Sequence, residues 1–164
     1  MNGRVRQASH SEGIDYAAWA DFRYEIRLWL RISEEVAARF DLPPQQHQLL
    51  LAIKGFRGPE SPMITDLAER MQLRHHSIVG LLDRMEQNGL VERHPTGEGR
   101  ALAIVLTRDG EELLAAVSNE LRPELQVAAR RLIAELARLT PARSSSRVLS
   151  REPGRRTARS ASSR

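Results

Sequence analysis

Apolar residues recur at helical spacing over most of this sequence, and the first such stretch runs from about Tyr16 to Phe40. Its apolar positions are Trp19, Phe22, Ile26, Trp29, Val36 and Phe40. Because these positions are three, four or seven residues apart, they share one face of a long helix. Two tryptophans on one face contribute a large apolar area, which serves either the core or a dimer interface.

Three shorter helical patterns follow before residue 90. The segment 41–44, with its two prolines, ends the first helix and begins a second. A third helix is expected to begin at Thr65, which we interpret as its N-cap, with Asp66 in the first turn. A fourth is expected to begin near His75 and to end at Gly89. The inner faces of the second and fourth helices are Leu49, Leu50, Ile53 and Phe56, and then Ile78, Leu81, Leu82 and Met85.

Two strand patterns follow, and in the second of them Leu102, Ile104 and Leu106 recur with the period of two that is typical of strands. We predict strands over 90–94 and 101–106, joined by a loop over 95–99. The residues at 62–64 are expected to form a short extended segment. Together these elements predict a β-hairpin that follows two consecutive short helices.

Thr107 is the expected N-cap of a last helix, which continues to about Thr140 with either a kink or a restart at Pro123. This order of elements predicts a mainly α fold with a small β-hairpin wing. Such a winged helix-turn-helix presents one helix to the major groove of DNA and a loop to the minor groove.

The pattern divides the chain into three parts. Residues 1–13 and 141–164 are polar and aperiodic, and we expect both to be disordered, the second as an Arg/Ser-rich tail. The domain between them, over 14–140, is expected to contain flanking helices at about 15–40 and 108–140 and a DNA-binding lobe at about 43–107.

The formal net charge of +4 is unevenly distributed. The tail at 141–164 holds seven arginines and one acid, which leaves 18 of the 25 basic and 20 of the 21 acidic residues in the rest of the chain. A DNA-binding body with this balance must concentrate its positive charge on one face. The tail either neutralises phosphates or only keeps the protein soluble.

Other features of the sequence exclude several classes of protein. Cysteine is absent, which excludes disulfides and thiolate metal sites. His75 and His76 are adjacent and so point about 100° apart on a helix, and we expect no metal there. Without catalytic or cofactor-binding motifs, we expect neither an enzyme nor a cofactor. No apolar run is long enough to cross a bilayer and no signal-peptide core is present, so the expected location is the cytoplasm.

Polar and basic side chains on the exposed side of the fourth helix and on the wing are candidate DNA contacts. Recognition helices contact bases mainly through their N-terminal residues. Gly80 leaves the middle of this surface bare, either for close approach to the duplex or as a tolerated defect. Arg100 either enters the minor groove or pairs with Glu98 in the wing loop. The candidate DNA-binding residues are Thr65, Arg74, His75, His76, Ser77, Gly80, Arg84, Arg93 and Arg100.

Two motifs in this region resemble those of the MarR (multiple-antibiotic-resistance regulator) family of winged-helix transcription factors. The segment LLDRMEQNGLVER at 81–93 is similar to the family's L-v-D-R-L-E-x-x-G-L-V-x-R. The segment EGRALAIVLT at 98–107 keeps the spacing of the family's D-x-R-x-x-x-V-x-L-T. The resemblance covers about residues 16–140. It implies a homodimer with interlocking N- and C-terminal helices, whose two lobes contact a pseudo-palindromic operator in double-stranded DNA.

The resemblance also implies a regulator, usually a repressor, that releases DNA when a small aromatic or phenolic ligand binds between the dimer region and the lobe. The candidate ligand-binding residues are Trp19, Arg23, Arg27 and His47. An arginine clamps a carboxylate while an aromatic wall holds a ring, which favours an anionic aromatic effector. Alternatively, both arginines are solvated or pair with acids of the partner. After residue 140 the family's sequence continues as helix, whereas this chain does not, which predicts a weaker dimer or one that relies more on the first helix.

Two other functions remain as alternatives to a DNA-binding regulator. One is a winged-helix module that binds another protein and has no specific operator, which suits the near-neutral body and the bare middle of the fourth helix. The other is an RNA-binding protein acting through the tail, which is less favoured because no aromatic residues alternate with the arginines there. A salt-dependent operator shift distinguishes the regulator from the protein-binding module.

Overall fold

The computed structural model describes residues 14–96 and 102–140. The two terminal segments expected to be disordered, and the wing loop with Arg100, lie outside the described residues. The elements, in chain order, are α1 (Tyr16–Ala38), α2 (Pro44–Lys54), α3 (Ile64–Met71), α4 (His75–Gln87), β1 (Val91–Pro95), β2 (Leu102–Leu106) and α5 (Arg108–Leu139).

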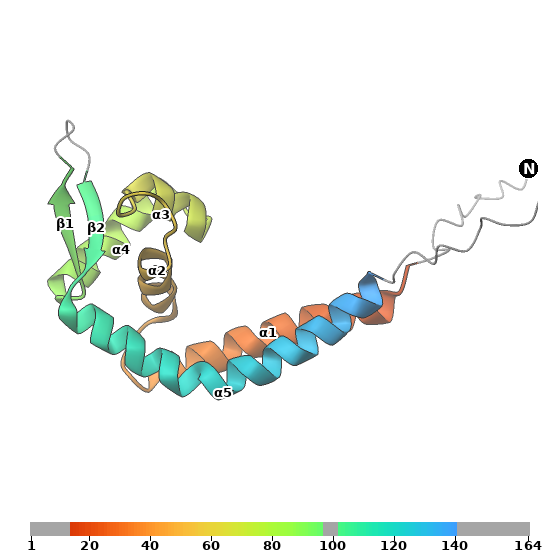
Figure 1. The fold of residues 1–164 in the computed structure, drawn as a ribbon. Coiled ribbons are helices and arrows are strands. Elements are labelled where there is room, and N and C mark those ends of the chain that lie inside the picture. The colour runs from red at the N-terminus through yellow and green to blue at the C-terminus, as the bar shows by residue number, and fades with distance from the viewer. Residues whose placement is uncertain (1–13, 97–101, 141–164) are drawn as a thin grey trace, which may run out of the picture.

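These elements form an arm and a lobe (Figure 1). The arm consists of α1 and α5, which run antiparallel along one another, and the lobe at one end of it contains α2, α3, α4, β1 and β2. The start of α1 and the end of α5 meet at the far end of the arm. A mainly helical chain with one antiparallel hairpin confirms the predicted winged helix-turn-helix fold class.

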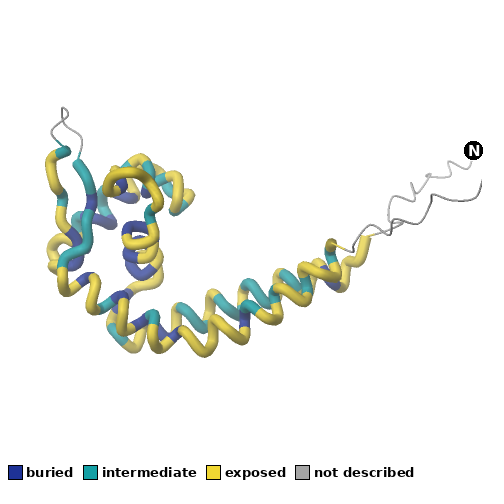
Figure 2. The backbone as a smooth tube through the Cα atoms, viewed as in Figure 1, coloured by how far each residue is buried: buried dark blue, intermediate teal, exposed yellow. Residues whose placement is uncertain are grey.

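The core lies inside the lobe and at its junction with the arm, while most of the arm is exposed or half-buried (Figure 2). All four apolar positions predicted for α4 are buried, as an amphipathic helix requires. Each such side chain contributes roughly 1.5–3 kcal/mol when it is fully removed from water. The largest fully buried side chains are Leu42, Leu49, Leu50, Leu67, Ile78, Leu82, Met85, Val91, Ile104 and Val117.

The wing is an antiparallel pair in which Val91 lies opposite Leu106 and Pro95 lies opposite Leu102. Of the extended segment predicted at 62–64, the first two residues join its edge, whereas Ile64 already begins α3. The Ile104 N–H donates to the Pro62 carbonyl at 2.9 Å, and Met63 bridges to Ala103. The connection before α3 is therefore attached to the wing.

The prediction that Thr65 caps α3 is wrong. The helix begins at Ile64 with Met63 as its N-cap residue, which places Thr65 inside the first turn. Asp66 explains the shift, because its Oδ2 accepts a hydrogen bond from the Met63 N–H at 2.8 Å and stabilises the entry to the helix from there. Between α3 and α4, Gln72 takes a left-handed conformation with φ of 53°, which turns the chain.

The junction between β2 and α5 follows the prediction. Thr107 is the N-cap of α5, and its Oγ1 accepts a hydrogen bond from the Gly110 N–H at 3.0 Å. Gly89, predicted as the left-handed stop of the fourth helix, has φ of +68°. The helix α5 runs through Pro123 without interruption, so of the two alternatives at that position a restart is excluded.

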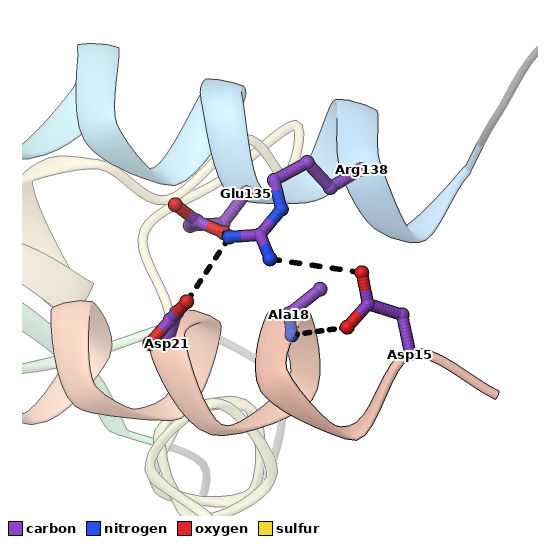
Figure 3. A network of polar contacts seen from close by, with 5 residues as sticks. All are labelled: Asp15, Ala18, Asp21, Glu135 and Arg138. Carbon is purple, nitrogen blue, oxygen red and sulfur yellow. Dashed lines mark hydrogen bonds and ion pairs between the residues drawn. The ribbon is translucent and has the colours of Figure 1, made fainter.

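An ion-pair network holds the far end of the arm together (Figure 3). Arg138 on α5 donates to Asp21 at 3.0 Å and to Glu135 at 2.6 Å, and it lies 3.6 Å from Asp15. Asp15 also caps α1 by accepting a hydrogen bond from the Ala18 N–H at 2.9 Å. The two ends of the described domain are thereby joined across more than 100 residues of sequence.

Apolar side chains nevertheless remain uncovered on the arm. Trp19 is 57% exposed, so within one chain it does not serve core packing, whereas Trp29 is half-buried against the core. Tyr16, Tyr24 and Ile133 are also exposed. None of the helices in the described ranges is long and apolar enough to span a bilayer.

Candidate nucleic-acid interface

The N-terminal turn of α4 faces solvent. Arg74 precedes the helix as its N-cap residue, and His75, His76 and Ser77 follow it, all four of them exposed. They project away from the core because the opposite side of the helix carries the buried apolar stripe. Guanidinium, imidazole and hydroxyl groups can form hydrogen bonds with base edges and with phosphates.

Several arginines on the lobe are free to meet an anionic partner. Arg57, Arg70, Arg74 and Arg84 are exposed, and none of them forms an ion pair within the described residues. Arg84 lies on α4, more than two helical turns after the N-cap residue Arg74. The lobe over 43–107 holds seven basic and seven acidic residues, so its DNA-binding face depends on where these four cations lie and not on a net positive charge.

Arg93 is placed differently from the other predicted DNA contacts. It leaves β1 toward α4, where its Nη2 lies 2.6 Å from Asp83 Oδ1 and its Nη1 donates to Glu86. Only 18% of its side chain is exposed. The geometry therefore supports a positioning role, since Arg93 ties the wing to α4 and offsets two negative charges that would otherwise repel phosphates.

Asp83 and Glu86 were missed as functional residues in the sequence. Both belong to the segment at 81–93, where they stand three residues apart on one helix and so share a face. The arginine that ends the same segment reaches both of them from the following strand. Two acids at this spacing followed by an arginine on a strand were the signal of a helix-to-wing ion pair.

Gly80 lies on α4 without a steric reason inside the protein. A Cβ atom built there would meet only Arg84 Nη1, at 3.8 Å, which is ordinary van der Waals contact. A glycine inside a helix lowers stability by about 0.5–1 kcal/mol relative to alanine. The fold therefore does not require this glycine.

Of the two remaining DNA-binding candidates, Thr65 and Arg100, the structure describes only the first. Thr65 is exposed in the first turn of α3. Arg100 belongs to the connection between β1 and β2 and lies outside the described residues.

The four candidate ligand residues do not come together within one chain. Trp19 and Arg23 are exposed near the start of α1, which is the end of the arm that lies far from the lobe (Figure 1). Arg27 is exposed further along the same helix. His47 is only 3% exposed in α2, inside the lobe. A site built from α1 therefore has to do without His47, unless a second chain alters the arrangement. In the described ranges, no group of three or more His, Asp or Glu side chains could hold a metal ion.

Burial changes the titration of His47. Desolvation lowers the pKa of its imidazole below the ordinary value, because the charged form loses its hydration. The side chain is therefore neutral in the folded protein at neutral pH.

We expect acid to destabilise the fold through His47. The unfolded chain takes up a proton at an ordinary pKa of about 6.5, while the folded chain takes it up only at lower pH. Stability is therefore greatest above that pH and falls as the pH drops below it, toward the lower pKa of the folded state. Thermal unfolding across this range should show the loss, and His47→Gln should reduce its slope. The exposed His75→Gln is the matched control, and equal slopes for the two variants would contradict the prediction.

A lobe in which α3 and the solvent-exposed α4 are followed by the β1–β2 hairpin is a winged helix-turn-helix. The chain matches the model of the MarR family over residues 40–101. Comparison with curated proteins finds no match.

Solved structures share the fold. MepR, a transcription regulator of a Staphylococcus aureus multidrug efflux pump, superposes with a TM-score of 0.63 at 21% identity, over 80% of this chain and 98% of MepR. A mutant of MarR from E. coli complexed with operator DNA gives 0.60 at 21% identity, over 71% and 84%. AbsC from Streptomyces coelicolor, a MarR family transcriptional regulator, gives 0.57 at 22% identity, over 77% and 88%. The family match and the shared fold confirm the resemblance to the MarR family.

Proposed function

We propose that this protein is a homodimeric transcriptional regulator that binds double-stranded DNA with α4 in the major groove and the wing at the minor groove. The observation that carries the proposal is the exposed N-terminal turn of α4, where Arg74 at the N-cap and Arg84 on the helix form no ion pair within the described residues. Arg93 supports it by offsetting the acids of α4 and by tying the wing to that helix. The MarR structure with operator DNA, which shares this fold, adds further support.

The dimer is proposed from the apolar side chains that one chain leaves exposed on the arm. They occur on both α1 and α5, and contiguous exposed apolar surface of this kind marks interaction sites on soluble proteins. A two-fold axis through the arm would present two α4 helices to successive major grooves, about 34–36 Å apart. The operator is then a pseudo-palindrome.

Trp19→Asp should break this dimer without unfolding the chain, because the side chain is 57% exposed and the substitution places a charge in the proposed interface. Sedimentation at micromolar concentration should show two chains for the parent protein and one for the variant. Leu51→Asp, an exposed apolar residue of α2 outside the arm, is the control. A parent protein that sediments as one chain would contradict both the dimer and the two-fold operator.

The finer proposal is a repressor that an anionic aromatic compound releases from DNA. Exposed Arg23 and Arg27 on α1, near exposed Trp19, provide two cations and a ring for such a compound. His47 does not contribute in this proposal, because it is buried in the lobe. A thermal-shift screen of phenolic and heteroaromatic acids tests it, and a positive compound must both stabilise the protein and release the operator.

The DNA-binding proposal is tested by selecting bound duplexes from a random pool. We expect enrichment of a pseudo-palindrome with half-sites one helical turn apart. Its affinity should fall with salt at a slope of about −0.9 per neutralised phosphate. Failure to enrich any sequence, with binding to a protein partner instead, would favour the alternative of a winged-helix protein-binding module.

Gly80→Ala should have opposite effects on folding and on DNA binding. The free energy of unfolding should rise by about 0.5–1 kcal/mol, because alanine favours the helix and its Cβ meets no clash. Affinity for the operator should fall, because the added methyl group occupies space between α4 and the duplex. Thermal unfolding and gel-shift titration measure the two effects, with Gln87→Ala at the end of α4 as control. A stabilised variant that binds with parental affinity would make Gly80 a tolerated defect.

A further inference from the structure

An open cavity of about 480 Å³ lies between the lobe and the start of α5. Its walls come from the end of α2, the connection from α2 to α3, the strand β2 and the first turn of α5. The volume is within the range of small-molecule sites, which is about 300–1,000 Å³. Its exposed lining is mainly polar, and Ile53, Phe56, Pro59, Pro62 and Val105 contribute its apolar part.

Three charged side chains line the same cavity. Lys54 Nζ lies 2.5 Å from Glu111 Oε1, so this ammonium is already paired. Glu60 forms no ion pair with any residue in the described ranges. Two carboxylates against one ammonium leave the cavity with an excess negative charge.

We propose that this cavity binds a small organic cation, an ammonium or amidinium group carried on a compact aromatic body. The ring would pack against Phe56 and the two prolines, and the cation would bind Glu60 and Glu111. An anion of the same size would instead face Glu60 and compete with Glu111 for Lys54. The expected charge is thus opposite to that of the compound proposed for the arginines of α1.

A second cavity shares lining residues with the first, and the two together would admit a longer compound. It has a volume of about 330 Å³ and is lined mainly by apolar atoms of α2 and α5, including Leu51, Leu114 and Ala115. Lys54 and Glu111 line both cavities, so their ion pair stands between them. Both side chains are about half exposed, and ion pairs of this kind are weak, so a ligand cation that draws Glu111 away meets little resistance.

The cavity wall is connected to both parts of the proposed DNA-binding surface. Pro62 lines the cavity and accepts the hydrogen bond from Ile104 of the wing at 2.9 Å. The next residue, Met63, bridges to Ala103 and is the N-cap of α3. A ligand that displaces this connection would shift the wing and α3 together. This consequence rests on the proposed function, whereas ligand binding itself does not.

The test uses three probes with one ring and different charges: benzylammonium, benzyl alcohol and benzoate. Titration of the full chain, followed by amide chemical shifts without DNA, should show saturable binding of benzylammonium near residues 53–62 and 104–111. Benzyl alcohol should bind more weakly, and benzoate weakest of all. Absence of saturable binding, changes confined to other regions, or equal affinity for benzoate would overturn the proposal.

Substitutions test whether the carboxylates of Glu60 and Glu111 bind the cation. Glu60→Gln and Glu111→Gln should each weaken benzylammonium binding by about two- to fivefold, as expected for loss of one partly exposed opposite charge. The matched control is Glu112→Gln, because Glu112 is adjacent, exposed and paired with Arg108 at 2.8 Å but does not line the cavity. Equal weakening by Glu112→Gln would overturn the assignment. Circular dichroism checks folding, and Glu60→Gln, on the connection outside any helix, remains decisive if the α5 variant is unfolded.

Addition of benzylammonium to an operator complex then measures the coupling separately. If the probe binds the free protein but leaves operator affinity unchanged, only the coupling to the wing is rejected. If no operator is found, the DNA-binding proposal fails while the cavity is still judged by the titration.

Discussion

Gly110→Ala should lower the free energy of unfolding by about 1–3 kcal/mol, the range for a group forced into a packed interior. A Cβ atom at this position would lie 2.1 Å from the Leu90 carbonyl oxygen and 3.0 Å from its carbon. Both of these are backbone atoms, so no side chain can rotate to make room. The helix α5 or the start of β1 would have to move instead.

The neighbouring hydrogen bonds make that movement costly. The Leu90 carbonyl accepts a hydrogen bond from the Thr107 N–H at 3.1 Å, and Thr107 Oγ1 donates to the Gly89 carbonyl at 2.6 Å. These bonds join the turn after α4 to the N-terminus of α5. A shift of α5 would therefore strain the same junction that sets the base of the wing.

Denaturant unfolding measures the effect, and the same substitution at Gly80 is the matched control. Both glycines are helical, but only Gly110 is buried against a backbone carbonyl. We expect Gly110→Ala to destabilise and Gly80→Ala to stabilise. Effects of the same sign would mean that helix propensity outweighs the clash at residue 110.

Arg100→Ala should lower operator affinity by about 1–3 kcal/mol, or roughly 5- to 150-fold, while leaving stability unchanged. Arg100 belongs to the connection that follows Pro95 and precedes Leu102, which are the last described pair of the wing. A guanidinium at this point of a winged helix-turn-helix can enter a narrow minor groove, where the negative potential is enhanced.

A gel-shift titration at one salt concentration decides the role of Arg100. Arg122→Ala, which removes the same charge from an exposed position on α5, controls for the loss of net charge. Equal losses in the two variants would assign the effect to non-specific electrostatics. Unchanged binding by Arg100→Ala would reject the minor-groove contact.

Local patterns in the sequence were sufficient to predict the elements of the lobe. The apolar stripe of α4 depends on residues three and four apart, and the whole stripe is buried as predicted. Thr107 and Gly89 act within a few residues of their own positions, so their roles as cap and stop could also be predicted. The fold class followed from the order of these elements.

Contacts between distant segments were decided by the tertiary structure. Whether Trp19 lies in the core depends on which face of α1 meets α5, and that face leaves Trp19 exposed. The separation of His47 from the start of α1 likewise follows from the length of the arm. The helical period identifies a face but does not indicate what covers it.

The partners of the charged residues were likewise decided by contacts between distant segments. The sequence predicted Arg93 as a DNA contact, but only the packing of β1 beside α4 brings it to Asp83 and Glu86. Arg138 meets Asp21 because the later part of α5 runs antiparallel along α1. The sequence by itself determined the helices, the strands and the surface of α4 that faces solvent. The tertiary structure decided which charges remain free to meet DNA, because an ion pair requires two segments that only the folded chain brings together.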